Sequence, residues 1–345
     1  MFSAHSDDSA RIFTAAELLP PQWSNPSRSG EPRFFNPAIA ACAAGYIMAY
    51  RVVLSDGLRR LAICRLDPNL AVEPGSQLPL SDLLSPPPER QYPGQAHRWF
   101  ADPRLIVHEN RLLLHWNSGS HQPSNHQFLQ ELDGQSLTPA GRPRELVLPG
   151  NQARLEKNWG LFSAEGNLFS VYSLAPLRIL RLAGIREGRM EFADASSAQW
   201  NHYPWSRRFG TLRGGAPPVL RQGRYVAVYH SCYQTRTGSR YVAGCLTYSG
   251  EPPFAPFACA ENPLALPNPF GNRFGQERLN STVAEVVYPC GALYDGGRWL
   301  ISYGINDEHA AIAVLDDAAV TGALRPVGRS PRMWTRDWLA RVIGR

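Results

Sequence analysis

The chain has 345 residues, of which 43% are hydrophobic and only 19% charged, with 30 prolines and 29 glycines. Few charges and many turn formers argue against a bundle of amphipathic helices and favour an all-β protein with its polar residues in turns. The net charge is +6, but the arginines are scattered without a basic run, which argues against a nucleic-acid partner.

The N-terminal extension, residues 1–30, begins MFSAHSDDSARIF and is acidic where a secretory signal would be basic and then apolar. No apolar run reaches the roughly 18 residues of a membrane span, so we expect no integral membrane segment and a cytoplasmic location. The six cysteines form no CxxC pair and no zinc-ligand spacing. This pattern favours free thiols in a reducing compartment and predicts neither a metal nor a cofactor.

A hairpin unit recurs five times along the chain, and in each unit a Pro- or Gly-containing turn leads into a short apolar strand. A tight turn with Gly or Asn follows, and a second apolar strand completes the unit. The first strands are FFNPAIA (34–40), FADPRLIV (100–107), EKNWGLF (156–162), GGAPPVL (214–220) and VVYPCGALY (286–294), and the second strands are GYIMAYRVV, RLLLHWN, NLFSVYSL, GRYVAVYH and GRWLISYG.

Five such hairpins predict one domain, residues 1–345, folded as a five-bladed β-propeller, because propellers grow by adding similar blades around one axis. The segment TRDWLARVIGR has helical spacing and predicts a C-terminal helix over residues 335–345. The blades are expected at about 34–66, 98–133, 155–185, 213–250 and 284–318.

The innermost strands of a propeller line its central channel, so polar residues near the beginnings of these strands are expected to converge. They are Asn36 with Arg51, Asp102 with Arg104, Lys157 with Asn158, His230 with Tyr241, and Asp307. The set offers carboxylates, cations and hydrogen-bond donors without a metal-binding cluster. The long stretches 78–94 and 200–213, the second rich in arginine and aromatic residues, are placed to reach over this channel.

Lys157 is the only lysine among 35 basic residues. A chain so biased toward arginine indicates a site where a compact, rotatable ammonium is needed and a planar guanidinium does not fit. The alternative is an accidental surface lysine.

Asp102 stands in ADPRL, where Pro103 predicts extended backbone at the aspartate and Arg104 is placed to orient its carboxylate. The pattern suits a proton-handling carboxylate and also an ordinary Asp-Pro turn with a local ion pair. Asp307, in YGINDEH, follows a strand and suits either binding of sugar hydroxyls or capping of a turn.

His230 is expected to end the strand GRYVAVYH, and Tyr241 to begin the next strand across a polar loop. A protonated or donating histidine beside a tyrosine hydroxyl can form an anion-binding cradle, although a structural histidine fits the sequence equally well. The sequence HWN, residues 115–117, forms another polar and aromatic strand edge.

Together these motifs resemble glycoside hydrolase family 130, the β-mannoside phosphorylases and related mannosidases, over roughly residues 34–318. The resemblance is strongest in VVYPCGALYDGGRWLISYGINDEHAAIAVLD, which is similar to the closing blade of the family. In this chain, FNPAIA with YIMAYRVV resembles the opening blade of the family, and ADPRL resembles its EDPR motif. The sequence EKNW is similar to the lysine motif of the third blade, and GGAPPV with VYH and Tyr241 resembles the fourth blade.

The resemblance implies a five-bladed propeller and an inverting reaction in which Asp102 acts as the general acid. It also implies that Asn36, Arg51 and Asp307 hold the mannosyl unit. Lys157, His230 and Tyr241 correspond to positions around the phosphate or the reactive centre. Arg104 and Asn158, which adjoin these residues, complete the predicted substrate-binding set.

Two positions depart from the family pattern. Ala101 stands where the family has glutamate, and Ser173 lies near the place of an arginine that grips phosphate in the phosphorylases. The second departure keeps open a β-mannosyltransferase that uses a sugar nucleotide or sugar phosphate, because related propellers of that kind are similar to this pattern.

The sequence therefore predicts an inverting enzyme that makes or breaks a β-mannoside-type bond, in the first place a phosphorylase or hydrolase. Its partners would be a mannose-type oligosaccharide or glycoconjugate, together with inorganic phosphate or an activated sugar donor. A non-catalytic glycan-binding propeller is the remaining alternative, because a fold does not guarantee its chemistry.

Overall fold

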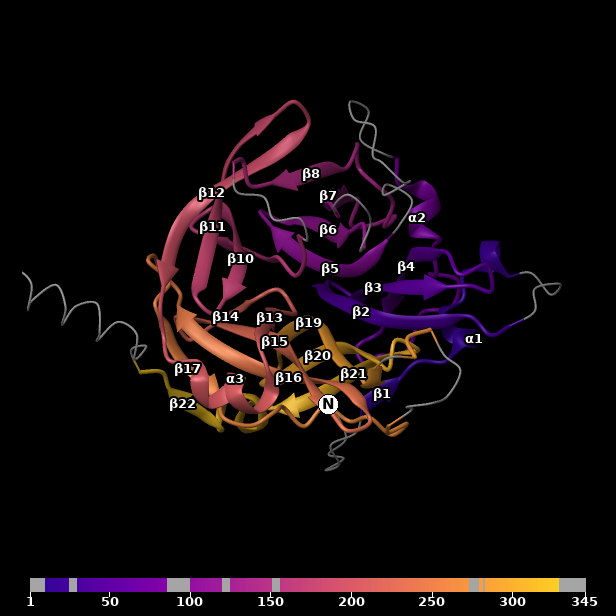
Figure 1. Cartoon of the computed structure of the whole chain (residues 1–345). Coiled ribbons are helices and arrows are strands. Elements are labelled where there is room, and N and C mark those ends of the chain that lie inside the picture. The colour runs from indigo at the N-terminus through magenta and orange to yellow at the C-terminus, as the bar shows by residue number, and fades with distance from the viewer. Residues whose placement is uncertain are drawn as a thin grey trace, which may run out of the picture.

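The computed structural model describes residues 10–24, 30–85, 100–119, 125–150, 156–272, 279–281 and 283–328. These residues are mostly β-strand, and Figure 1 shows curled sheets fanning out around the middle of the molecule. Every strand pair in these ranges is antiparallel except β8–β12 and β16–β18. The C-terminal helix expected at 335–345 lies outside the described residues.

The strands group in chain order into hydrogen-bonded sheets. The first sheet contains β2 (Arg33–Cys42), β3 (Gly45–Val53) and β4 (Arg59–Leu66). The second, eight-stranded sheet contains β5 (Ala101–His108), β6 (Arg111–Asn117), β7 (Gln127–Leu132), β8 (Arg144–Val147), β9 (Gly160–Ala164), β10 (Asn167–Leu174), β11 (Leu177–Arg186) and β12 (Arg189–Ala198).

A third sheet and a fourth sheet complete the strand inventory of the described residues. The third contains β13 (Leu212–Gly214), β14 (Val219–Arg221), β15 (Arg224–Thr235), β16 (Gly238–Ser249), β17 (Pro256–Ala260), β18 (Val283–Glu285) and β22 (Leu324–Pro326). The fourth contains β19 (Val287–Asp295), β20 (Arg298–Ile305), β21 (His309–Asp316) and β1 (Ala10–Ile12).

The helices are short and lie between strands. They are α1 (Ala15–Leu18), the 3-10 turn η1 (Pro21–Trp23), α2 (Leu80–Leu83), α3 (Tyr203–Phe209) and α4 (Asp317–Thr321). No helix in the described part of the chain is long and apolar enough to cross a membrane.

The eight-stranded sheet consists of two antiparallel groups, β5–β8 and β9–β12, which are joined edge to edge by the parallel pair β8–β12. This pairing connects Arg189 with Glu145 in register and unites two units that the sequence presents as separate hairpins. The two groups remain distinct in their antiparallel connections, so the parallel pair is a bridge between their outer strands.

Strands of successive groups contact one another around the centre of the molecule. Strand β5 contacts β2 and β9, β10 contacts β13, β15 contacts β19, and β19 returns to contact β2. The N-terminal segment takes part in this closure because β1 pairs with β21, joining the beginning of the chain to its last sheet. Residues near the starts of the inner strands therefore meet although they are far apart in sequence.

Apolar side chains fill the space between neighbouring sheets. One large cluster joins β9–β11 to the third and fourth sheets, and others lie under β2–β4 and between β5–β7 and the first sheet. Four tryptophans, Trp159, Trp200, Trp205 and Trp299, are among the largest fully buried side chains. Many of the aromatic residues of the chain therefore pack between the sheets.

The inner strands are irregular at their starts. The pairing register shifts between Phe35 and Ala38 in β2 and between Ala101 and Arg104 in β5. These bulges contain Asn36 and Asp102, whose φ angles are 52° and 50°. Asn and Asp tolerate positive φ better than other residues with a Cβ, and a bulge turns their side chains toward the centre.

The prediction of extended backbone at Asp102 was wrong. Pro103 disfavours the right-handed helical region for the residue before it, but the bulge places Asp102 at positive φ instead. Tertiary pairing with β6 on both sides of the bulge imposes this conformation.

Close backbone approach at the centre predicts that Gly214 is essential for packing. An alanine Cβ at this position would lie 2.1 Å from the carbonyl oxygen of Asn158, a backbone atom with little room to move. We expect Gly214→Ala to lower the free energy of unfolding in urea by about 1–3 kcal/mol. Gly184→Ala in β11 is the matched control, since a Cβ at Gly184 would meet no atom within 4 Å; equal losses in both variants would contradict the prediction.

Candidate active site

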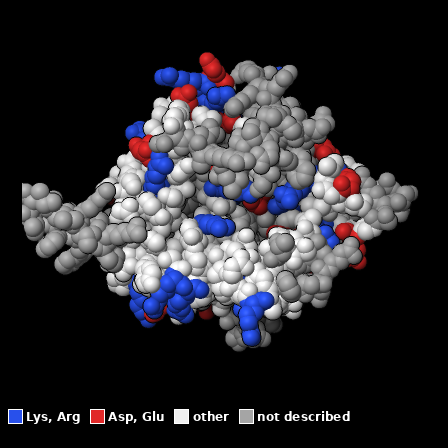
Figure 2. Space-filling view, in the orientation of Figure 1, with Lys and Arg blue, Asp and Glu red and all other residues white. Residues whose placement is uncertain are grey.

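A cavity of about 380 Å³ lies where the inner strands meet. Figure 2 shows basic and acidic atoms together in a hollow near the middle of one face. The side chains that line the cavity are Phe35, Asn36, Arg51, Arg59, Asp102, Lys157, Asn158, Arg213, His230, Tyr241, Leu279, Asn280, Val286, Tyr288 and Asp307. Eight of the nine sequence-predicted site residues are in this set, the exception being Arg104.

The residues that line the cavity differ in solvent exposure. Asn36, Arg51, Asp102, His230 and Tyr288 are buried, whereas Lys157, Asn158, Tyr241 and Asp307 are half-buried and Arg213 is exposed. The described lining carries four cationic side chains and two carboxylates. A ligand in the cavity therefore meets a buried polar floor and a basic rim.

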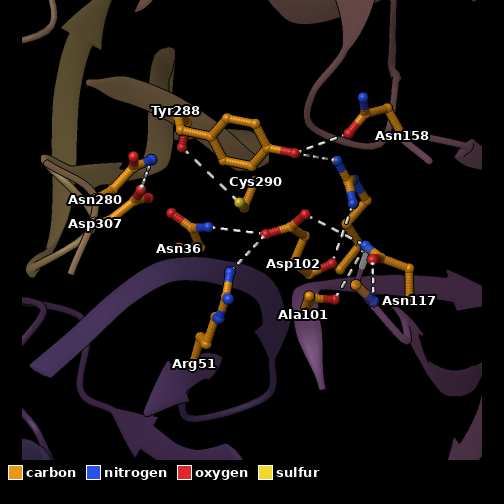
Figure 3. Close-up of polar contacts among 12 residues, drawn as sticks. Asn36, Arg51, Ala101, Asp102, Asn117, Asn158, Asn280, Tyr288, Cys290 and Asp307 are labelled. Atoms are coloured by element: carbon orange, nitrogen blue, oxygen red, sulfur yellow. Dashed lines mark hydrogen bonds and ion pairs between the residues drawn. The ribbon is translucent and has the colours of Figure 1, made fainter. Parts of the chain in front are cut away.

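Hydrogen bonds and an ion pair fix the carboxylate of Asp102 on the floor of the cavity (Figure 3). Its Oδ1 accepts a hydrogen bond of 2.9 Å from the amide of Asn36 on β2, and Nη1 of Arg51 on β3 lies 3.4 Å from the same oxygen. Its Oδ2 accepts a bond of 3.3 Å from the amide of Asn117 on β6. Both oxygens are thus engaged by donors from three different strands.

This environment favours the ionised carboxylate. Burial raises the pKa of Asp102, but the charges of Arg51, Arg104 and Lys157 and one hydrogen bond outweigh burial and lower the pKa to about 2. In the unliganded protein at neutral pH, Asp102 is therefore a carboxylate.

Arg104 does not line the cavity, contrary to its assignment to the substrate-binding set. Its side chain is fully buried beneath Asp102, and it donates from Nε to the carbonyl of Gly215 at 2.5 Å and from Nη1 to the carbonyl of Asp102 at 3.1 Å. Its Nη2 lies 3.5 Å from the hydroxyl of Tyr288. Arg104 is a positioning residue, because its donors face protein acceptors in three parts of the ring.

Lys157 and Asn158 enter the cavity from the segment before β9. The buried carboxylate of Glu156 anchors this segment by accepting hydrogen bonds from the indole of Trp159 and the hydroxyl of Tyr172. Burial lowers the pKa of Lys157, while the nearby charge of Asp102 opposes this effect. The only lysine of the chain is therefore held beside the buried carboxylate.

His230 and Tyr241 lie face to face across the hairpin β15–β16, with ring centroids 5.9 Å apart. The strands are longer than expected: β15 runs to Thr235 and β16 starts at Gly238, so the expected polar loop is strand. Burial and the charges of Arg213 and Arg104 lower the pKa of His230 to about 3. Of the two expected forms of His230, a protonated or a donating histidine, the protonated one is excluded at physiological pH, where the imidazole is neutral.

The remaining predicted residues are fixed by neighbours that the sequence did not single out. Asn158 accepts a hydrogen bond of 2.8 Å from the hydroxyl of Tyr288. Asp307 accepts one of 3.1 Å from the amide of Asn280. Asn158 and Asp307 share with Asp102 a positive φ, at 63° and 58°. Because Asn36 also has a positive φ, this conformation at an Asn or Asp recurs in four of the units that build the cavity.

Five polar lining or supporting residues were missed by sequence reasoning: Arg59, Arg213, Asn117, Asn280 and Tyr288. Asn117 belongs to the polar strand edge HWN, and Arg213 belongs to the Arg-rich stretch 200–213. These two sequence patterns could have identified both residues as candidates for the site. Arg59 begins β4, the third strand of its sheet, and no local pattern indicates that its side chain reaches the centre.

The two departures from the family pattern can also be located. Ala101 is buried at the start of β5. Ser173 is outside the cavity lining, and its hydroxyl donates to the carbonyl of Pro176 at 2.7 Å. Arg213 and Arg59 nevertheless supply guanidinium groups to the cavity from other strands. No group of three or more metal-ligating side chains is found among the residues that the structure describes.

Comparison with known proteins found no matching family model and no matching curated protein. Solved structures do match. The β-1,2-mannobiose phosphorylase from Listeria innocua is 15% identical, with 91% of this chain and 98% of that chain covered and a TM-score of 0.60. A member of glycoside hydrolase family 130, a family of mannoside phosphorylases that contains hydrolases of β-1,2-mannosidic linkages in Candida mannan, is 12% identical, with 96% and 98% covered and a TM-score of 0.63.

A third similar structure is the α-L-arabinofuranosidase from Lactobacillus brevis, at 13% identity, 88% and 96% coverage and a TM-score of 0.53. Identities this low show a shared fold and do not transfer an activity. The resemblance expected from the sequence is thus confirmed at the level of structure: the chain has family 130 mannoside phosphorylases among its structural neighbours.

Proposed function

We propose that this protein is a carbohydrate-active enzyme that makes or breaks a β-mannoside-type glycosidic bond with inversion, on a five-bladed β-propeller. The observation that carries the proposal is Asp102, a buried carboxylate held at the floor of a cationic cavity. The structural neighbours of the chain include a mannobiose phosphorylase and a member of the family 130 mannoside phosphorylases, a family that also contains mannoside hydrolases. These neighbours support a mannoside as the substrate class.

The five-blade assignment rests on strand grouping. If the eight-stranded sheet is divided at the parallel pair β8–β12, the four sheets become five groups of mainly antiparallel strands. Each group contacts the next around the centre. The pairing of β1 with β21 then ties the chain's beginning to the last blade, as ring closure requires.

In the phosphorolytic reaction, a phosphate oxygen bonds to the anomeric carbon while the bond to the leaving sugar oxygen breaks. Asp102 supplies the proton that the leaving oxygen needs, directly or through a sugar hydroxyl as the family resemblance implies. Lys157 and Arg213, with the neutral donors of Tyr241 and His230, hold the phosphate. Asn36, Arg51 and Asp307 bind the sugar, so that the acid and the anion face opposite sides of one carbon.

A β-mannosyltransferase is the second candidate, and the ionised state of Asp102 favours it. A carboxylate can accept the proton of an acceptor hydroxyl that attacks the donor sugar, and the cations around the cavity can hold the departing phosphate of an activated donor. The third candidate, a non-catalytic glycan-binding propeller, predicts binding without turnover.

The three candidates are separated by a substrate panel. We expect manno-oligosaccharides with inorganic phosphate to yield mannose 1-phosphate. Chromatography and ³¹P NMR measure this product. Product from oligosaccharides without phosphate would indicate hydrolysis instead. Elongation of a manno-oligosaccharide acceptor with GDP-mannose as donor, and with no product from the other mixtures, would replace phosphorolysis with transfer. Binding of every sugar with no product would exclude both enzymatic proposals.

Asp102→Asn tests the proton-handling role. The amide keeps the shape of the side chain but cannot transfer the proton, so we expect kcat to fall about 10²–10⁴-fold. Thermal stability should also fall, because the amide no longer balances the charges of Arg51 and Lys157. Asp316→Asn, at an exposed aspartate at the end of β21, is the control and should keep full activity. An Asp102→Asn enzyme with the parent kcat would rule out this residue as the acid or base.

Lys157→Arg tests whether the cavity needs a compact ammonium. The charge is kept, but a larger planar guanidinium would replace a half-buried ammonium in a cavity that Arg51, Arg59 and Arg213 already line. We expect KM for the phosphate-bearing substrate to rise roughly tenfold, with a smaller effect on binding of the neutral sugar. Arg207→Lys, a conservative exchange on the exposed side of α3, is the control, and identical kinetics for Lys157→Arg and the parent would contradict the assignment.

A further inference from the structure

The hydrogen bonds around Asp102 are arranged for an anion. Asn36 and Asn117 donate through their amide groups, and Arg51 can only donate. The orientation of Asn117 is fixed because its Oδ1 accepts the backbone N–H of Gly119 at 2.8 Å. A general acid must carry a proton, so the unliganded arrangement is the opposite of the one that phosphorolysis needs.

Asn36 gives the cavity a way to accept a protonated Asp102. Its Oδ1 is buried and makes no hydrogen bond to any residue that the structure describes. It occupies space left by Gly304, where a Cβ would lie only 2.0 Å from this oxygen. If the side-chain amide of Asn36 rotated by half a turn, its Oδ1 would face Asp102 and could accept a hydrogen bond from the protonated acid. No existing hydrogen bond of Oδ1 would be lost.

The cations that stabilise the carboxylate are also the ones that an anionic ligand would approach. Arg51 and Lys157 both act on Asp102 and both line the cavity, where Arg59 and Arg213 join them. A bound phosphate would offset these charges and place a negative group near the carboxylate. Burial then dominates, and burial favours the neutral acid.

We propose that binding of an anion in the cavity and protonation of Asp102 are one coupled event, so that the co-substrate converts this residue from a carboxylate into the general acid. The inference rests on the proposed function, because it requires the cavity to bind phosphate or a phosphate-bearing sugar. It explains how a carboxylate held by three donors can serve phosphorolysis.

Other titratable or charged groups act on Asp102 from each side of the cavity. They are Arg51 on β3, Arg59 on β4, Arg104 on β5, His115 on β6, Lys157 before β9, His230 on β15, and Tyr288 and Cys290 on β19. Asp307 also lines the cavity, where its charge acts on Arg59, and it is the other carboxylate of the described lining. The test must therefore distinguish Asp102 from Asp307.

Sulfate is the suitable probe, because it carries two negative charges throughout the working pH range and brings no proton of its own. If binding raises the proton affinity of Asp102, each bound sulfate draws up to one proton from the buffer. The sign follows: sulfate affinity should increase as the pH falls below the pKa of the liganded carboxyl, by up to tenfold per pH unit, and level off above it.

The experiment is isothermal titration calorimetry of the full chain with sulfate, between about pH 4 and pH 8, in buffers that differ in ionisation enthalpy. We expect buffer-dependent heats that show proton uptake by the parent protein. Asp102→Asn, which imitates the protonated acid, should bind sulfate roughly tenfold more tightly at pH 7 and take up no proton. Asp307→Asn should retain the uptake. Circular dichroism checks that both variants are folded.

Three results would overturn the inference. Sulfate binding by the parent protein without proton uptake over the whole range would separate the two events and leave the anion site intact. Uptake that persists in Asp102→Asn would assign the proton to another group. Failure of both the parent and Asp102→Asn to bind sulfate would remove the anion-binding part of the proposed function as well.

Discussion

The cavity depends on a buried negative charge that its surroundings must neutralise. A carboxylate placed in a protein interior costs several kcal/mol unless charges and hydrogen bonds compensate for the lost water. Asp102 obtains this compensation from Asn36, Arg51 and Asn117, which come from β2, β3 and β6. The site therefore exists only when the first two groups of strands are packed together around the same centre.

Arg104 extends this dependence to the rest of the ring. From one buried guanidinium it reaches the backbone of its own strand, the carbonyl of Gly215 before β14, and the hydroxyl of Tyr288 on β19. Tyr288 in turn holds Asn158 in the segment before β9. Closure of the fold and placement of the polar groups are thus parts of the same network, in which each member is held by a partner.

The electrostatic state of the cavity distinguishes it from a ready-made acid site. Enzymes that need a protonated carboxyl commonly obtain it from an apolar environment, whereas here cations surround the carboxylate. Such a cavity suits chemistry in which an anion arrives or departs, because the ligand changes the local charge at the moment of reaction. Both the phosphorylase and the transferase proposals share this feature, and their difference lies in which group carries the phosphate.

The sequence by itself determined that the chain is β-rich, where its hairpins begin, and that polar residues at those beginnings converge. Turn residues and apolar strand patterns are local, and the single lysine and the Asp-Pro motif are visible without a fold. Only the tertiary structure decided that Arg104 supports the site from beneath it, that Arg59 and Arg213 reach the cavity, that His230 is neutral, and that Asp102 adopts positive φ. The physical reason is that burial, charge proximity and strand register arise between segments that are distant along the chain.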